Sequence, residues 1–215
     1  LGRRLTRPEH YEALCGQKCA AHLIRPDEAG RRDLVGILQG LDAEGNVTLT
    51  DGDETYTFPV EARYGDADFA EAAWKRFLNR MWANGTLRFS AFATIHKEAA
   101  WRLMELTEQA GLSALIGKVN MDRNSPDTLR ETTEESLAET RRWLEESADG
   151  KLVRPILTPR FTPSCTDELM VGLGRLQQEF DVPMQSHLSE NPSEIAWVQQ
   201  LCPTTRCYAE SYVPV

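Results

Sequence analysis

The sequence predicts an α/β protein in which a small β module precedes a series of βα units. Short alternating strands separated by turn residues occupy about the first 55 residues. From about residue 64 the apolar residues follow a helical spacing, and helices then alternate with strands through short connections. Such a series implies a parallel sheet with helices outside it, either a doubly wound sheet or part of a (β/α)₈ barrel.

The first segment has the pattern of a small β-barrel. Turn residues at 42–46 and 51–53 separate the apolar runs, and a helical turn is expected over 7–14. The expected strands are 19–24, 35–41 and 47–50. Short strands at this spacing indicate an SH3-like barrel.

The second segment predicts four βα units. Phe69, Ala73, Phe77 and Met81 recur every four residues along one face of a first helix, which Asn84-Gly85 ends. Thr132 or Thr133 with Glu135 forms a capping box at a later helix. The expected helices are 66–81, 97–109, 131–147, 167–180 and 192–201, and the expected strands are 87–95, 112–119, 153–157 and 182–186.

Composition narrows the classes of partner and compartment. The formal net charge of −9 argues against DNA binding and against an anionic membrane surface, which would both require a basic face. We find no apolar run near the roughly 20 residues that span a bilayer, and no apolar region of a secretory signal behind the first residues. Leu1 in place of Met suggests that the numbering begins inside a longer reading frame. Five cysteines, an odd number, favour a reducing cytoplasm.

Polar residues follow all four expected strands, where the parallel architectures place their sites. They are His96, Asn120 to Asn124, Thr158 to Phe161, and His187 to Glu190. His187 could ligate a metal and Glu190 could carry a proton to a metal-bound water; the alternative is a surface histidine with Glu190 capping the next helix. Arg160 could clamp a flat substrate on which Phe161 stacks, or it could form a structural ion pair. His96 could be a ligand or a structural histidine, and Asp122 is expected to serve loop structure.

The segment from Tyr56 onward resembles the guanine deaminases. Its motifs in family order are Tyr56 to Glu61, Asn84 to Thr86, Phe92 to His96, Gly117 to Asn124, Thr158 to Phe161, and Gln185 to Asn191. The resemblance implies a zinc-dependent (β/α)₈ amidohydrolase barrel, usually dimeric, that hydrolyses guanine to xanthine and ammonia. It also implies that His187 is a zinc ligand, Glu190 the proton shuttle, and Arg160 and Phe161 the purine-binding pair.

The sequence also departs from that family pattern. The family's first barrel strand ends in an H-x-H metal motif, whereas the four histidines here are His10, His22, His96 and His187. The family's next zinc histidine and its late metal-binding aspartate are expected beyond residue 215. A catalytic zinc takes about three protein ligands, so we expect this chain alone to have little or no deaminase activity.

The first 55 residues resemble the C-terminal SH3-like domain of the ribosome maturation factor RimP. The motifs are Leu5 to Tyr11, Gly16-Gln17, Arg31 to Leu38, and Val47 to Leu49. This resemblance implies contact with the small ribosomal subunit. We therefore expect two parts, an SH3-like module over 1–55 and a partial guanine deaminase barrel over 56–215. The alternatives are a ribosome-assembly module with a passenger segment, and a non-functional chimera.

Overall fold

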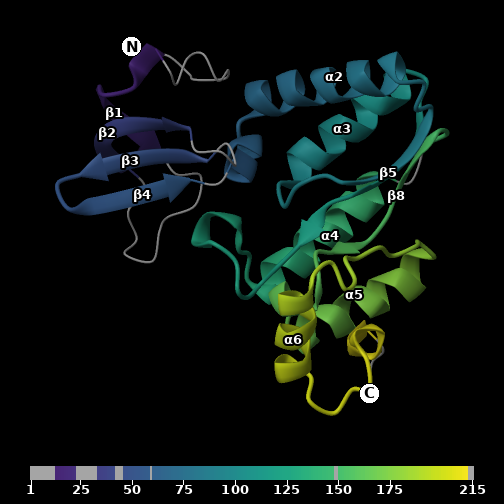
Figure 1. Cartoon of the computed structure of the whole chain (residues 1–215). Coiled ribbons are helices and arrows are strands. Elements are labelled where there is room, and N and C mark those ends of the chain that lie inside the picture. The colour runs from purple at the N-terminus through teal and green to yellow at the C-terminus, as the bar shows by residue number, and fades with distance from the viewer. Residues whose placement is uncertain (1–12, 23–32, 42–45, 59, 148–149, 213–215) are drawn as a thin grey trace. The chain divides into compact units, whose positions relative to one another are not determined.

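The structure is a computed structural model that describes residues 13–22, 33–41, 46–58, 60–147 and 150–212 (Figure 1). The chain divides into two compact units. The first unit is Leu1–Ala72 with Pro126–Leu129, and the second is Ala73–Ser125 with Arg130–Val215. Most of the helical turn expected over 7–14 lies outside the described residues, although residues 13 and 14 are helical.

The first unit contains an antiparallel four-stranded sheet in the order β1-β2-β3-β4. Its strands are β1 (Lys18–His22), β2 (Asp33–Leu41), β3 (Val47–Asp51) and β4 (Glu54–Phe58). Residues alternate between buried and exposed along β2, because successive side chains point to opposite faces of a strand. Leu38, Val47 and Leu49 form the core of this sheet. The expected strands at 19–24, 35–41 and 47–50 are confirmed where they are described.

The strand β4 adds a feature that the sequence did not predict. It pairs with β3 in antiparallel register, with Tyr56 opposite Leu49 and Thr57 opposite Thr48. The predicted boundary between residues 55 and 56 therefore falls inside this strand. A short 3-10 helix, η1 (Val60–Gly65), follows before α2 (Ala67–Ala83) begins.

The second unit alternates strands with helices. The strands β5 (Arg88–Phe92), β6 (Ser113–Gly117) and β8 (Val153–Pro155) form a parallel sheet, and β7 (Val119–Asn120) pairs in parallel with β9 (Thr158–Pro159). The helices are α3 (Lys97–Gln109), α4 (Thr133–Glu146), α5 (Asp167–Phe180) and α6 (Pro192–Leu201). Three 3-10 helices complete the described elements: η2 (Asp127–Leu129), which belongs to the first unit, η3 (Thr162–Ser164) and η4 (Tyr208–Tyr212).

The helices α3, α4 and α5 of the second unit lie side by side in chain order. The helix α3 packs against β6, β8 and α4, and α4 packs against α5 (Figure 1). A doubly wound sheet distributes its helices over both faces, whereas a (β/α)₈ barrel gathers them in one outer layer. The packing therefore favours a partial (β/α)₈ barrel over a doubly wound sheet.

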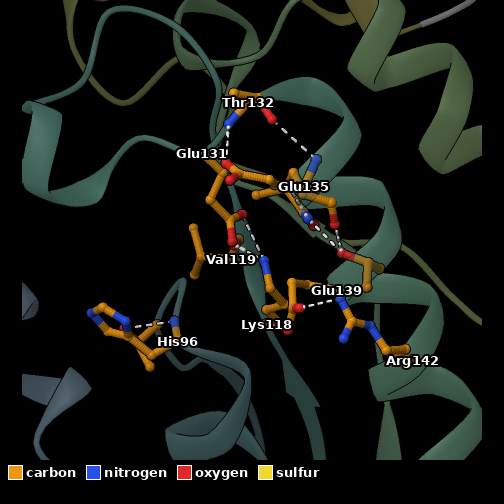
Figure 2. Close-up of polar contacts among 12 residues, drawn as sticks. His96, Lys118, Val119, Glu131, Thr132, Glu135, Glu139 and Arg142 are labelled. Carbon is orange, nitrogen blue, oxygen red and sulfur yellow. Dashed lines mark hydrogen bonds and ion pairs between the residues drawn. The ribbon is translucent and has the colours of Figure 1, made fainter. Parts of the chain in front are cut away.

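The helix ends follow the sequence signals. The hydroxyl of Thr132 accepts a hydrogen bond from the N–H of Glu135 at 3.2 Å, and the Glu135 carboxylate accepts one from the N–H of Thr132 at 3.0 Å (Figure 2). This reciprocal pair is the predicted capping box of α4. Gly85 ends α2 with φ +68°, the left-handed conformation that glycine adopts at little cost.

The fourth expected strand, 182–186, forms only one parallel bridge, between Leu157 and Met184. Its backbone still follows the sheet, because Leu157 donates to Pro183 O and Gln185 donates to Leu157 O, both at 2.9 Å. Pro183 itself has no N–H to donate, so a regular ladder cannot form there. Within the described part of the chain, no helix has both the length and the apolar character needed to cross a membrane.

Candidate functional site at the strand ends

Arg160 connects three strand ends of the second unit. It directly follows β9, and its N–H donates to the carbonyl oxygen of Asn120, the last residue of β7, at 3.1 Å. Its own carbonyl oxygen accepts from the N–H of His187 at 3.1 Å and lies 2.7 Å from His187 Nδ1. Parallel pairing brings these residues together, because the carboxyl ends of parallel strands meet at one edge.

The imidazole of His187 is held in one tautomer. A carbonyl oxygen only accepts, so Nδ1 must carry the proton that is donated to Arg160. In the neutral imidazole the other ring nitrogen, Nε2, then keeps its lone pair and can bind a metal ion. The ring of Phe92, at the end of β5, packs against the imidazole with the centroids 4.3 Å apart. The geometry fits the predicted use of His187 as a metal ligand.

The guanidinium of Arg160 lies over the aromatic ring of Phe161. The Arg160 guanidinium carbon lies 5.3 Å from the centre of the Phe161 ring, and its Nη1 lies 3.8 Å from Met121 Sδ. Phe161 also meets Trp197 of α6 edge to face, with centroids 6.2 Å apart. A guanidinium beside aromatic rings can hold a planar heterocycle by hydrogen bonding and stacking.

Glu190 is exposed and follows His187 by three positions. Within the described residues, its carboxylate makes no hydrogen bond or ion pair with Arg160, Phe161 or His187. Ser189, between His187 and Glu190, has φ +55°, so the chain turns sharply there. The alternative that Glu190 caps the next helix is wrong, since Asn191 is the N-cap of α6 and accepts from Glu194 N at 2.9 Å.

Two other polar residues at the strand ends have structural positions. The Asp122 carboxylate accepts hydrogen bonds from Thr133 Oγ1 at 2.7 Å, Thr166 N at 2.8 Å and Thr166 Oγ1 at 2.5 Å. It therefore ties the starts of α4 and α5 to the end of β7, as the expected loop role implies. His96 is the N-cap residue of α3 and makes no side-chain capping bond.

A buried ion pair stabilises the loop between β6 and α4. Lys118 Nζ lies 2.7 Å from Glu131 Oε2, and the two side chains are 0% and 1% exposed (Figure 2). The N–H of Glu131 also donates to Met121 O at 3.1 Å. The ion pair thus joins the two ends of the loop that contains Met121. The Sδ atom of Met121 lies 3.8 Å from Arg160 Nη1. The sequence reasoning missed this pair, because a lysine inside an apolar strand gives no sign of its partner.

The described residues supply only part of a zinc site. No three histidine, cysteine, aspartate or glutamate side chains among them gather closely enough to hold a metal ion. A catalytic zinc takes about three protein ligands. The described residues therefore do not by themselves form a zinc site, and the use of His187 as a metal ligand stays a prediction.

Residues 42–212 match the amidohydrolase family, which is most of the chain. The chain belongs to the amidohydrolase family. Among its relatives, the guanine deaminase of Dictyostelium discoideum is 48% identical over 161 residues, and that of Homo sapiens is 42% identical over 162 residues. A crystal structure of the C. acetobutylicum guanine deaminase with bound guanine in the active site superposes with a TM-score of 0.69 at 42% identity.

These alignments cover most of this amidohydrolase chain but a smaller part of each relative. They span 74%, 73% and 71% of this chain, and 36%, 35% and 36% of the three relatives in the same order. The chain therefore spans about a third of the length of the relatives it matches. The family match starts at residue 42, so it includes the strands β3 and β4.

Proposed function

We propose that this amidohydrolase chain carries the purine-binding part of a guanine deaminase, the enzyme that hydrolyses guanine to xanthine and ammonia. The observation that carries the proposal is the contact of Arg160 and His187, with Phe161 beside them, at the carboxyl ends of parallel strands. The identity of 48% to a guanine deaminase supports guanine as the substrate.

Each proposed role follows from the chemistry of the side chain. Guanine presents O6 and N7 as neighbouring acceptors, which match the paired N–H groups of the Arg160 guanidinium. Phe161 would stack on the purine ring. Glu190 would carry a proton to the ring, and His187 would give one ligand to Zn²⁺ through Nε2.

The metal is the incomplete part of the proposed site. Zn²⁺ would supply an activated water, but one prepared ligand does not hold a catalytic zinc. We therefore expect the 215-residue chain by itself, supplied with zinc and guanine, to form xanthine no faster than the uncatalysed reaction. The proposed setting is the cytoplasm, because all five cysteines are free thiols.

Guanine binding tests the proposal without requiring turnover. Quenching of Trp197 fluorescence reports a purine bound beside Phe161, and a Trp197→Phe variant isolates that signal from the other four tryptophans. We expect Arg160→Ala and Phe161→Ala each to weaken guanine binding about tenfold or more. Arg175→Ala, an exposed arginine on α5, is the matched control. Absent guanine binding, or equal loss in the Arg175 control, would contradict the proposed site.

A second candidate function concerns residues 1–55, which we propose as an SH3-like ribosome-assembly module. The antiparallel strands β1, β2 and β3, which lie within these residues, are the observation that favours it. Co-sedimentation of the chain with small ribosomal subunits is the test, and a chain that stays in the supernatant would remove this candidate.

A further inference from the structure

The hydroxyl of Tyr212 makes three hydrogen bonds at the candidate site. It donates to the carbonyl oxygen of His187 at 2.5 Å. It accepts from the N–H of Thr162 at 3.2 Å and lies 3.0 Å from Ser186 Oγ. A phenolic hydroxyl has one proton and can accept about two hydrogen bonds, so this set uses its full capacity.

The partners of this hydroxyl come from two separate strand ends. Thr162 follows Arg160 and Phe161 after β9, whereas Ser186 and His187 follow the bridge at Met184. Tyr212 therefore joins the segment that carries the proposed purine-binding pair to the segment that carries the proposed metal ligand. Its position 50 residues after Thr162 and 25 after His187 means that only the fold brings the three together.

The ring of Tyr212 is itself held in place. It stacks on Tyr208 with centroids 5.9 Å apart and planes 8° apart, and both residues belong to η4. The neighbouring Ser211 Oγ lies 2.6 Å from Thr162 Oγ1, which fastens η4 to the same segment a second time. A side chain fixed on both sides can set the position of its partners rather than follow them.

The hydrogen bond from His187 Nδ1 to Arg160 depends on the same spacing. Its Nδ1 to O distance is 2.7 Å, and Ser186 Oγ lies 3.3 Å from the same carbonyl oxygen. If the two segments separated, this bond would lengthen, and the imidazole would be free to place its proton on Nε2 instead. The position of the proton on the His187 ring therefore reports the distance between the segment that carries Arg160 and the segment that carries His187.

We propose that Tyr212 is a positioning residue that fixes the purine-binding pair, Arg160 and Phe161, relative to His187. The role in catalysis rests on the proposed deaminase site, whereas the geometric role does not. Tyr212 acts through its hydrogen bonds to the backbone of Thr162 and His187. The sequence reasoning stopped at the helix α6, so it missed this residue.

The test compares Tyr212→Phe with Tyr208→Phe. The first variant keeps the stacked ring and removes the three hydrogen bonds, whereas the second removes a hydroxyl from the stacking partner and leaves those bonds in place. The ring ¹⁵N spectrum at pH 8.5, well above the ordinary histidine pKa of about 6.5, reports the tautomer of neutral histidines. His187→Gln identifies the His187 signals among the four histidines.

We expect Tyr212→Phe to shift the His187 proton from Nδ1 toward Nε2 and to weaken guanine binding roughly 5- to 20-fold. Tyr208→Phe should stay within about twofold of the parent chain in guanine affinity, with an unchanged tautomer. Ser186→Ala removes one hydrogen-bond partner of the Tyr212 hydroxyl. It should change the His187 tautomer and the guanine affinity in the same direction as Tyr212→Phe, but less. This variant replaces Tyr212→Phe if the latter does not fold.

The outcomes separate this proposal from the proposed function. A parent chain that does not bind guanine contradicts the deaminase site, while the ¹⁵N spectrum still decides whether Tyr212 sets the spacing. An unchanged His187 tautomer in Tyr212→Phe and in Ser186→Ala overturns the positioning role. Equal effects of Tyr208→Phe and Tyr212→Phe also overturn it, because the hydroxyl bonds would then be irrelevant.

Discussion

His187 Nδ1 lies 2.7 Å from the carbonyl oxygen of Arg160, although the two residues are 27 positions apart in the sequence. This one hydrogen bond sets the tautomer of the candidate metal ligand and fixes it to the backbone of the candidate purine-binding residue. The same carbonyl oxygen accepts the N–H of His187 at 3.1 Å. Contacts with the Arg160 carbonyl oxygen therefore hold the proposed metal ligand, His187, next to the proposed purine-binding residue, Arg160.

The buried ion pair of Lys118 and Glu131 gives the first prediction. Lys118→Met leaves the Glu131 carboxylate buried without its cation, so we expect a loss of about 3–5 kcal/mol in unfolding free energy. Adding Glu131→Leu should restore part of that loss, because no uncompensated charge remains. Urea unfolding measures both variants.

The exposed ion pair of Arg141 and Glu179 provides the control for that experiment. Its side chains are 43% and 50% exposed, so solvent screens their attraction. Arg141→Ala should therefore destabilise the chain far less than Lys118→Met. A Lys118→Met variant as stable as the Arg141 control would contradict the prediction.

Cys165 gives a pH-dependent prediction. Burial, the largest cause, raises the pKa of this thiol from 9.0 to about 11, while Ser164 opposes the rise. Between these values the unfolded chain loses the proton before the folded chain does, so stability falls as pH rises through this window. The Cys165 contribution, up to roughly 2–3 kcal/mol, is fully present below pH 9 and lost by about pH 11.

The measurement is unfolding free energy at pH 8 and at pH 10.5 for the parent chain and for Cys165→Ala. Lysines and tyrosines titrate in the same range, so the quantity to compare is the difference between the two proteins. That difference should shrink at the higher pH. A difference that is constant with pH would show that Cys165 contributes nothing to the pH dependence.

Two glycines give a matched pair of substitutions to alanine. A Cβ on Gly117, at the end of β6, would lie 1.7 Å from Thr158 Oγ1 and 2.7 Å from Ile156 O, so backbone would have to move. A Cβ on Gly174, inside α5, would meet no atom within 4 Å. Gly117→Ala should destabilise the chain by at least about 2 kcal/mol, whereas Gly174→Ala should stabilise it by roughly 0.5–1 kcal/mol.

Thermal unfolding of the two variants tests whether Gly117→Ala lowers the unfolding temperature and Gly174→Ala raises it. Gly117 is the last residue of β6 and lies two positions before β7, which pairs with β9, so its replacement would also disturb the segment that leads to Arg160. If Gly117→Ala unfolds at the same temperature as the parent chain, that result would contradict the close contact between Gly117 and Thr158.

Asp122 gives the last prediction. Asp122→Asn removes the charge from a group that accepts three hydrogen bonds from Thr133 and Thr166. Because hydrogen bonds to charged groups are the stronger ones, we expect a loss of roughly 1–3 kcal/mol in urea unfolding. Glu145→Gln, an exposed change on α4, is the control and should stay near the parent value. An equal stability of the two variants would show that the Asp122 contacts are unimportant.

The helices and most strands follow from local sequence signals. The helices expected at 97–109, 167–180 and 192–201 coincide with α3, α5 and α6, and the Thr132–Glu135 capping box marked the start of α4. These signals are local, because a cap or an amphipathic face depends on residues within a few positions. The strand expected at 182–186 was reduced to a bridge, because Pro183 breaks the ladder.

The sequence by itself also determined which residues follow the strands, so Arg160, Phe161 and His187 could be chosen as candidates in advance. Their roles, and that of Glu190, remain predictions. Tertiary structure alone decided that His187 donates to Arg160 and that Tyr212 spans two strand ends. The physical reason is that a hydrogen bond between residues 25 to 50 positions apart depends on how the strands pair and how the last segment packs. A local pattern carries no information about either.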